Sequence, residues 1–142
     1  MRYILDTSVI LQWYHRSGEL HPKEAKQILD DLKSGRIEVS IPNVLPLELL
    51  NALIKGKGLS VDEANQTLNE LFEMPIKIID VTLPVLELAA TLMERYNLAS
   101  YDAYFLALAK YEQCILISDD QKAHGQIKDG SVVMLEGYQI RS

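Results

Sequence analysis

The sequence predicts an α/β fold in which a parallel five-stranded sheet is flanked by helices, with one domain spanning residues 1–142. Three observations support this prediction. Five short segments rich in Ile, Val and Leu recur along the chain. Several of them are apolar throughout, as in strands that are buried on both faces of a parallel sheet. Helical patterns separate them, and strands that alternate with helices form parallel sheets through right-handed crossovers.

Local signals mark where several of the expected helices begin and end. Ser34-Gly35 is typical of a helix stop. Ser60 and Glu63 have the spacing of a capping box. Pro84 suits a first helical turn and Ser100 suits an N-cap. The expected strands are Tyr3–Leu5, Ile37–Ile41, Ile76–Ile79, Ile115–Ile117 and Val132–Leu135, and the expected helices are Pro22–Lys33, Pro46–Lys55, Val61–Phe72, Leu83–Arg95 and Tyr101–Gln113.

Composition excludes several classes of protein. Twenty acidic and fourteen basic residues give a net charge of −6, which excludes a strongly basic nucleic-acid coat. The single cysteine, Cys114, cannot form an internal disulfide, which fits a cytoplasmic location. No apolar run approaches the roughly 20 residues of a membrane span, and the first run breaks at Asp6. We therefore expect no contact with membranes and no signal peptide.

Acidic residues follow two of the expected strands and begin one of the helices. In α/β sheets the site lies beyond the carboxyl ends of the strands. Asp6 ends the first strand, and Asp119 and Asp120 follow the fourth. Asp102 lies in the first turn of a strongly apolar helix. Each acid also has a purely structural interpretation, because Asp is a favoured N-cap, suits a helix dipole and is often solvated in loops.

Glu48 interrupts a helical segment that is otherwise apolar. Only Glu48, Asn51 and Lys55 are polar between residues 44 and 55, and their spacing places them on one face. This stripe faces either solvent or a site, and an isolated buried carboxylate needs a cation or hydrogen-bond donors. Clustered carboxylates suit hard cations such as Mg²⁺ or Mn²⁺. A pocket of this kind commonly serves phosphodiester chemistry.

Four short motifs, in this order, resemble those of PIN-domain ribonucleases, and the length resembles that of the compact PIN toxins of VapBC-type toxin–antitoxin pairs. The resemblance spans about residues 2–122. The motifs are Leu5-Asp6-Thr7-Ser8-Val9-Ile10, Glu48 with Asn51 on an apolar helix, Tyr101-Asp102-Ala103 and Ile117-Ser118-Asp119-Asp120.

The resemblance implies a divalent-metal-dependent endoribonuclease that acts on RNA, forms a homodimer and is blocked by a small antitoxin protein. It implies that Asp6, Glu48, Asp102 and Asp120 hold Mg²⁺ or Mn²⁺. In the family pattern one spacer residue separates the Thr or Ser from a single Asp. Here the spacer is Asp119, an extra acid, so either Asp119 or Asp120 can be the ligand closer to the metal. The expected supporting residues are Thr7 and Ser8 beside Asp6, Asn51 beside Glu48 and Ser118 before the fourth acid.

A second hypothesis is a catalytically weak PIN-like RNA-binding or scaffold protein whose acids hold only a structural cation. No Gly-rich phosphate loop follows the first strand, and no Gly-x-Ser-x-Gly elbow is present. His15, His21 and His124 lack a metal-binding spacing, so we expect them at the surface. The bases nearest the candidate site segments are Arg16, Lys55, Lys57 and Lys122.

Overall fold

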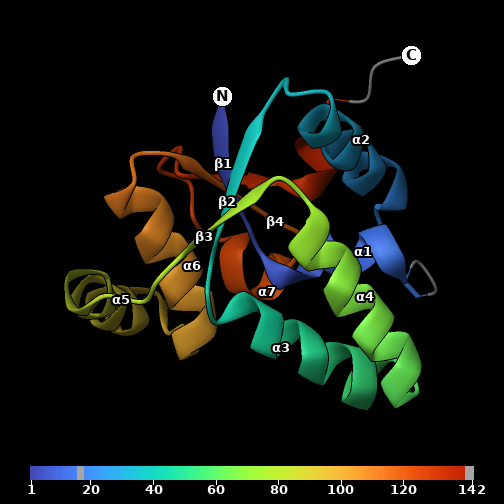
Figure 1. The fold of residues 1–142 in the computed structure, drawn as a ribbon. Helices are drawn as coiled ribbons and strands as arrows, with labels where there is room; N and C mark the ends of the chain where they lie inside the picture. Colours follow the sequence, from blue (N-terminus) through green and yellow to red (C-terminus); the bar gives the residue numbers. More distant parts are fainter. Residues whose placement is uncertain (16–17, 140–142) are drawn as a thin grey trace.

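The computed structural model describes residues 1–15 and 18–139, and its centre is a five-stranded parallel sheet (Figure 1). The strand order is β3-β2-β1-β4-β5, and every neighbouring pair is parallel. The predicted fold class is therefore confirmed. The strands are β1 (Arg2–Leu5), β2 (Glu38–Pro42), β3 (Ile76–Ile79), β4 (Ile115–Ser118) and β5 (Val132–Met134).

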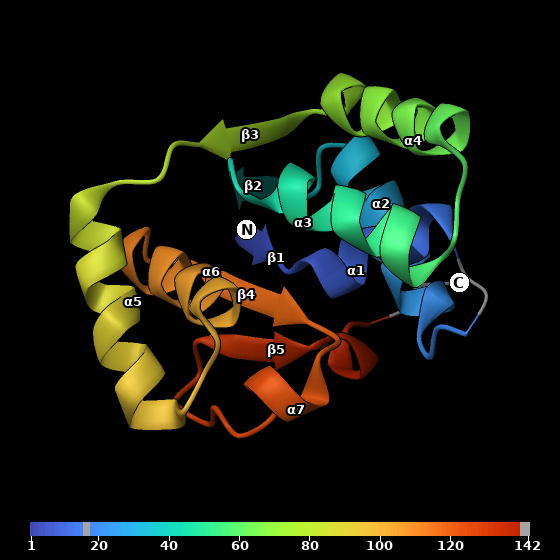
Figure 2. The ribbon, with the colours of Figure 1, turned by 90° about the horizontal axis from the view of Figure 1, so that it is seen from below.

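Helices cover both faces of this sheet. In Figure 2, α5 and α6 lie on one side of the sheet and α1 and α2 lie on the other. Helix α6 is the central one, because it contacts β1, β2 and β4 and every residue from 103 to 109 is buried. The helices are α1 (Thr7–Tyr14), α2 (Pro22–Lys33), α3 (Leu45–Asn51), α4 (Val61–Glu73), α5 (Leu83–Tyr96), α6 (Ser100–Tyr111) and α7 (Gln121–His124), with a π-helical turn η1 (Ala52–Gly56) and a 3₁₀ turn η2 (Leu135–Gly137).

Most of the local signals act as expected. Ser60 and Glu63 form the capping box of α4, with both reciprocal hydrogen bonds present. Helix α2 ends at Ser34, and Gly35 follows with φ 79°, a left-handed conformation that glycine adopts without strain. Ser100 is an exception: it is the first residue of α6, and Ala99 is the N-cap without a side-chain hydrogen bond.

Three features of the helices are absent from the sequence prediction. Helix α1 was not expected, because it buries residues on several of its sides and so lacks a polar stripe. Helix α7 is a single turn, which is too short to show a periodicity. The helix expected over Pro46–Lys55 changes to a π-turn after Asn51, where Lys57 N–H donates to the Ala52 carbonyl.

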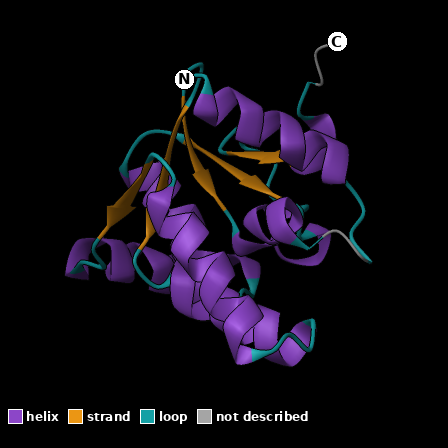
Figure 3. Ribbon diagram, turned by 45° about the vertical axis from the view of Figure 1, so that its right-hand side comes forward, coloured by secondary structure: helices purple, strands orange, loops and turns teal. Residues whose placement is uncertain are grey.

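The parallel arrangement brings the ends of β1 and β4 together. All strands point toward the same edge of the sheet (Figure 3). Leu5 is in register with Ile117, so Asp6 and Ser118 follow at adjacent positions of that edge. Asp6 N–H donates to the Ile117 carbonyl at 3.0 Å, which fixes the start of the loop. Within the described ranges, no helix is long and apolar enough to cross a membrane.

Candidate active site

Asp6 lies at the junction between β1 and α1 and is 4% exposed. Its Oδ2 accepts hydrogen bonds from Ser8 N–H at 3.3 Å and from Ser8 Oγ–H at 2.5 Å. The carboxylate is therefore the N-cap of α1 and also faces the sheet edge. Asp6 can be both an N-cap and a candidate site residue, because an N-cap uses only part of the hydrogen-bond acceptor capacity of a carboxylate.

Glu48 reaches the same edge from helix α3. The side chain is half-buried, and it accepts a hydrogen bond from the Thr7 hydroxyl. Thr7 itself is buried at the start of α1, so this bond ties α3 to the loop that carries Asp6. Asn51 is exposed one turn further along α3. Among the described residues, no hydrogen bond joins Asn51 to Glu48.

Asp102 and Asp120 complete the group from two further elements. Asp102 lies in the first turn of α6 and is half-buried. Asp120 caps α7, because its Oδ1 accepts from Ala123 N–H at 3.0 Å. Its own N–H donates to Ser118 Oγ at 3.1 Å, which fixes the turn after β4. Four carboxylates from four separate segments are thus held beside the ends of β1 and β4.

The pKa shifts show that these four carboxylates interact with one another. Burial raises the pKa of Asp6, and the charge of Asp120 adds to this effect, while His124 and the Ser8 hydrogen bonds oppose it. Burial also raises the pKa of Glu48; the charges of the other three acids add to the increase, and the bond from Thr7 opposes it.

Asp102 follows the same pattern. Burial raises its pKa first, the charges of Asp6 and Asp120 raise it further, and His124 opposes them. The charge of Asp120 therefore acts on the other three acids, and like charges at this range disfavour ionisation unless a cation offsets them. Among the described residues, no Lys or Arg forms an ion pair with any of the four.

Asp119 lies outside this group. Its Oδ1 is 2.7 Å from His21 Nδ1, and its Oδ2 accepts from Gln12 Nε2 at 2.7 Å. It contributes to none of the pKa shifts of Asp6, Glu48 or Asp102. The structure therefore places Asp120 among the acids and uses Asp119 to join the end of β4 to α1 and to the residue before α2.

Gln12 completes this second network. It is 1% exposed, its Nε2 also donates to the Ser8 carbonyl at 3.1 Å, and its Oε1 accepts from His21 N–H at 3.1 Å. Ser8 Oγ accepts from Asp119 N–H at 2.9 Å, so Ser8 belongs to both networks. Ser8 was predicted to support Asp6. Its hydroxyl donates to Asp6 and accepts from Asp119 N–H, so one side chain contacts both Asp6 and the turn after β4.

His124 is wrongly expected at the surface, since it is completely buried. Its Nε2 is 3.0 Å from the Asp102 carbonyl oxygen, and its Nδ1 is 2.7 Å from Ser118 Oγ. A carbonyl oxygen only accepts, so Nε2 carries a hydrogen and donates. The ring joins β4 to the first turn of α6. No spacing in the sequence indicates this contact, because it joins residues that are 22 positions apart.

The donor set fits a hard divalent cation. It consists of carboxylate oxygens, which Mg²⁺ and Mn²⁺ favour, and no Lys or Arg in the described part of the chain is paired with them. Within residues 1–15 and 18–139, however, no three such side chains form a preassembled ligand group. Mg²⁺ is usually held by one or two carboxylates and retains several waters, so a looser group is compatible with it.

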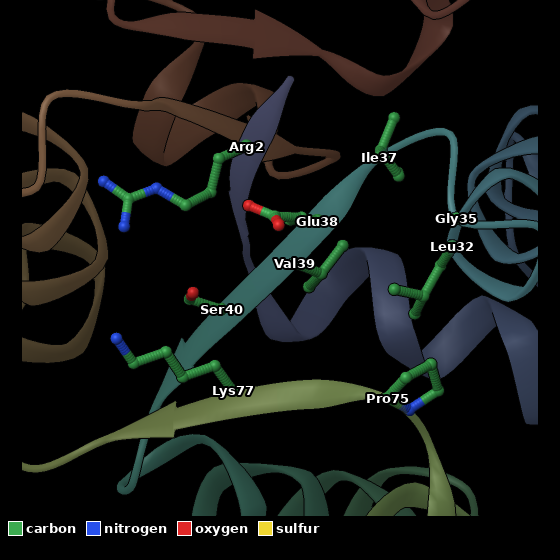
Figure 4. Close-up of a pocket in the computed structure, with 9 residues that line it drawn as sticks. All are labelled: Arg2, Leu32, Gly35, Ile37, Glu38, Val39, Ser40, Pro75 and Lys77. Carbon is green, nitrogen blue, oxygen red and sulfur yellow. The ribbon is translucent and has the colours of Figure 1, made fainter.

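Basic side chains are sparse near the acids. Lys57 forms an ion pair with Glu19 at 2.8 Å. Lys55 and Lys122 are exposed, and Arg16 lies outside the described residues. Figure 4 shows a separate hollow that is lined by Arg2, the first residue of β1, and by Lys77, the second residue of β3. That hollow is at the amino-terminal edge of the sheet, opposite the acids.

Comparison with known proteins agrees with the fold. Residues 3–127 match the model of the PIN-domain family. Comparison with curated proteins gives no match by sequence. Solved structures provide several matches in fold. A toxin–antitoxin complex from Klebsiella pneumoniae has a TM-score of 0.69 and 23% identity, over 94% of this chain and 97% of that chain.

Two further structures are similar. VapBC2 from Rickettsia felis, bound to a DNA fragment from its promoter, has a TM-score of 0.69 and 19% identity, over 94% of this chain and 98% of that chain. VapC20 from Mycobacterium tuberculosis, a toxin that cleaves the sarcin–ricin loop, has a TM-score of 0.68 and 16% identity, over 91% of this chain and 98% of that chain.

Proposed function

Because the chain belongs to the PIN-domain family, we propose that it is a divalent-metal-dependent endoribonuclease and the toxin of a type II toxin–antitoxin pair. One observation carries the proposal: four carboxylates from separate elements lie at the carboxyl edge of the sheet, and no Lys or Arg of the described residues forms an ion pair with them. Mutual repulsion of this kind costs stability, and a chain that keeps all four acids needs a cation to offset it.

Asp6, Glu48, Asp102 and Asp120 would hold Mg²⁺ or Mn²⁺, some directly and some through water. When bound, the cation supplies positive charge at the reacting phosphate and lowers the pKa of a water. The chain supplies orientation. Ser8 fixes the carboxylate of Asp6, and Thr7 fixes that of Glu48.

Two residues hold the remaining acids in place. Ser118 Oγ accepts from Asp120 N–H, and His124 donates to the carbonyl of Asp102. These contacts fix the backbone segments that carry the acids, so we expect a cation to bind by movement of the carboxylate side chains rather than of whole elements.

The proposed partners follow from the similar structures. The similar structure from Klebsiella pneumoniae is a toxin–antitoxin complex, so we infer a small antitoxin protein that binds this chain. A basic antitoxin segment suits an acidic pocket on a protein with a net charge of −6. We further propose that the chain forms a homodimer and acts in the cytoplasm.

The proposed activity is tested by a metal titration with two readouts. The purified chain is incubated with RNA in Mg²⁺, Mn²⁺ or excess EDTA, and thermal unfolding is measured in the same buffers. We expect cleavage and a raised Tm with metal and neither in EDTA. Asp6→Asn, prepared identically, reveals a contaminating nuclease because contamination would survive the substitution.

The alternatives give different results. A raised Tm without cleavage would favour the scaffold protein with a structural cation. Cleavage by the wild-type chain in excess EDTA, absent from the Asp6→Asn preparation, would contradict the metal-dependent mechanism.

A further inference from the structure

A hollow of about 550 Å³ opens beside the acid group, and two of the four acids form part of its wall. Asp102 and Asp120 line one side. Residues 96–99, which connect α5 to α6, line another, and Lys122, Ala123 and Gln126 complete it. Its volume is within the range of pockets that hold small organic ligands.

The lining combines three kinds of chemistry. Lys122 supplies a cation, and its side chain is exposed. Within the described residues it forms no ion pair, even with Asp102 and Asp120 in the same hollow. Asn97 and Gln126 supply amide groups, and Leu98, Ala99 and the half-buried Tyr96 supply apolar surface.

Local structure fixes the shape of this hollow. Asn97 ends α5 in a left-handed conformation with φ 55°, which turns the chain sharply toward α6. Gln126 Nε2 donates to the Tyr96 carbonyl at 3.0 Å and so joins the two walls. Lys122 lies on α7, whose first turn Asp120 caps. The positive charge of Lys122 therefore lies on the short helix that Asp120 caps.

We propose that this hollow binds the nucleotide next to the scissile phosphate of a single-stranded RNA, with Lys122 contacting the phosphate of that nucleotide. The proposal rests on the proposed function, which places the scissile phosphate at the acids. The adjoining nucleotide then enters a space that offers a cation for its phosphate, apolar surface for its sugar and base, and amides for the base edge.

The charge distribution favours RNA over a protein segment in this hollow. A phosphate is attracted by Lys122 and repelled by Asp102 and Asp120, but the cation of the proposed function offsets that repulsion. A basic peptide is then repelled by both Lys122 and the cation. On a chain with a net charge of −6, RNA binding depends on a few local cations, since phosphate neutralisation supplies much of the affinity. An unpaired lysine close to the acids is well placed for this.

The test compares Lys122→Gln with Lys128→Gln. Both lysines are exposed and both substitutions remove one positive charge, but Lys128 does not line the hollow. Binding of a labelled single-stranded RNA of about ten nucleotides is measured in EDTA, where no cleavage is expected. We expect Lys122→Gln to weaken binding about three- to tenfold and to reduce the salt slope of binding by about 0.7. Lys128→Gln should change neither.

A gain of affinity gives an independent check. Gln126→Lys adds a second cation to the lining of the hollow and should tighten RNA binding at least threefold. Gln66→Lys adds the same charge to the exposed face of α4, away from the hollow, and should not. In Mn²⁺, Lys122→Gln should raise KM for RNA while kcat stays within about twofold of wild type, since the residue binds a neighbouring nucleotide.

The outcomes separate this proposal from the proposed function. Metal-dependent cleavage with equal RNA affinity for Lys122→Gln and Lys128→Gln would overturn the nucleotide subsite alone. So would a Lys122→Gln variant that changes the affinity for a basic peptide but not for RNA. If the wild-type chain neither binds nor cleaves RNA, both proposals fail.

Discussion

The buried ring of His124 donates a hydrogen bond from Nε2 to the backbone carbonyl oxygen of Asp102, across 3.0 Å. On its other side, Nδ1 is 2.7 Å from Ser118 Oγ. One side chain thus connects the turn that carries Asp120 with the helical turn that carries Asp102. We therefore expect the separation between these two acids to depend on His124, which is not one of the proposed ligands.

Removing this connection should weaken both folding and metal binding. His124→Leu removes the hydrogen bonds to the Asp102 carbonyl and to Ser118 Oγ, each worth about 1 kcal/mol, while Ser118 Oγ keeps its bond from Asp120 N–H. We expect a loss of stability of at least about 2 kcal/mol by denaturant unfolding. His124→Gln keeps a donor and should lose less. Mn²⁺ affinity should follow the same order when measured below the unfolding transition, and equal affinity in all three proteins would contradict the positioning role.

Asp6→Asn should abolish cleavage while stabilising the metal-free protein. Burial and repulsion raise the pKa of Asp6 above its ordinary value of 3.8, so the folded state binds its proton more tightly than the unfolded state does. Stability is therefore lost as pH rises through the folded pKa. Asn retains the cap but cannot ionise.

Thermal unfolding in EDTA at several pH values checks this prediction. The Tm advantage of Asp6→Asn over wild type should be present at neutral pH and shrink as pH falls toward 3.8. A variant that is less stable than wild type at neutral pH, or one that cuts RNA at the wild-type rate, would contradict the assignment of Asp6.

Asp120→Asn should weaken Mn²⁺ binding or cleavage at least tenfold more than Asp119→Asn, a difference of about 1.4 kcal/mol. Asp120 acts on the other acids, whereas Asp119 contacts Gln12 and His21. Asp119→Asn should instead reduce stability by about 1 kcal/mol, because a charged acceptor is lost. Metal titrations and denaturant unfolding of both variants decide the matter; equal losses of metal affinity would indicate shared ligation.

Thr7→Val should make metal binding more sensitive to acid. Its hydroxyl lowers the pKa of Glu48 against the effects of burial and neighbouring charge, and Val keeps the shape without the donor. The pKa of Glu48 should then rise, so protons compete more strongly with the cation. We expect the loss of Mn²⁺ affinity to be larger at acidic than at alkaline pH. Ser8→Ala is the matched comparison, because it also removes one hydroxyl donor, but from Asp6 rather than from Glu48.

Features that depend on neighbouring residues could be predicted from the sequence. The apolar strands, the capping box of Ser60 and Glu63 and the helix stop at Gly35 depend on local conformation, so their positions could be predicted to within a few residues. The parallel sheet also followed, because alternating strands and helices permit few other arrangements. That arrangement was enough to indicate Asp6 and the pair Asp119 and Asp120 as residues at one edge.

Which polar side chains contact one another depends on how the helices and strands pack in the tertiary structure. Asp119 and Asp120 are neighbours in the chain with the same chemistry, yet one contacts His21 and the other affects Glu48. The burial of His124 beside Asp102 is equally invisible in the sequence. Each depends on packing between segments far apart in the chain, and a side chain's partners follow from the orientation of whole elements, which local propensity does not encode.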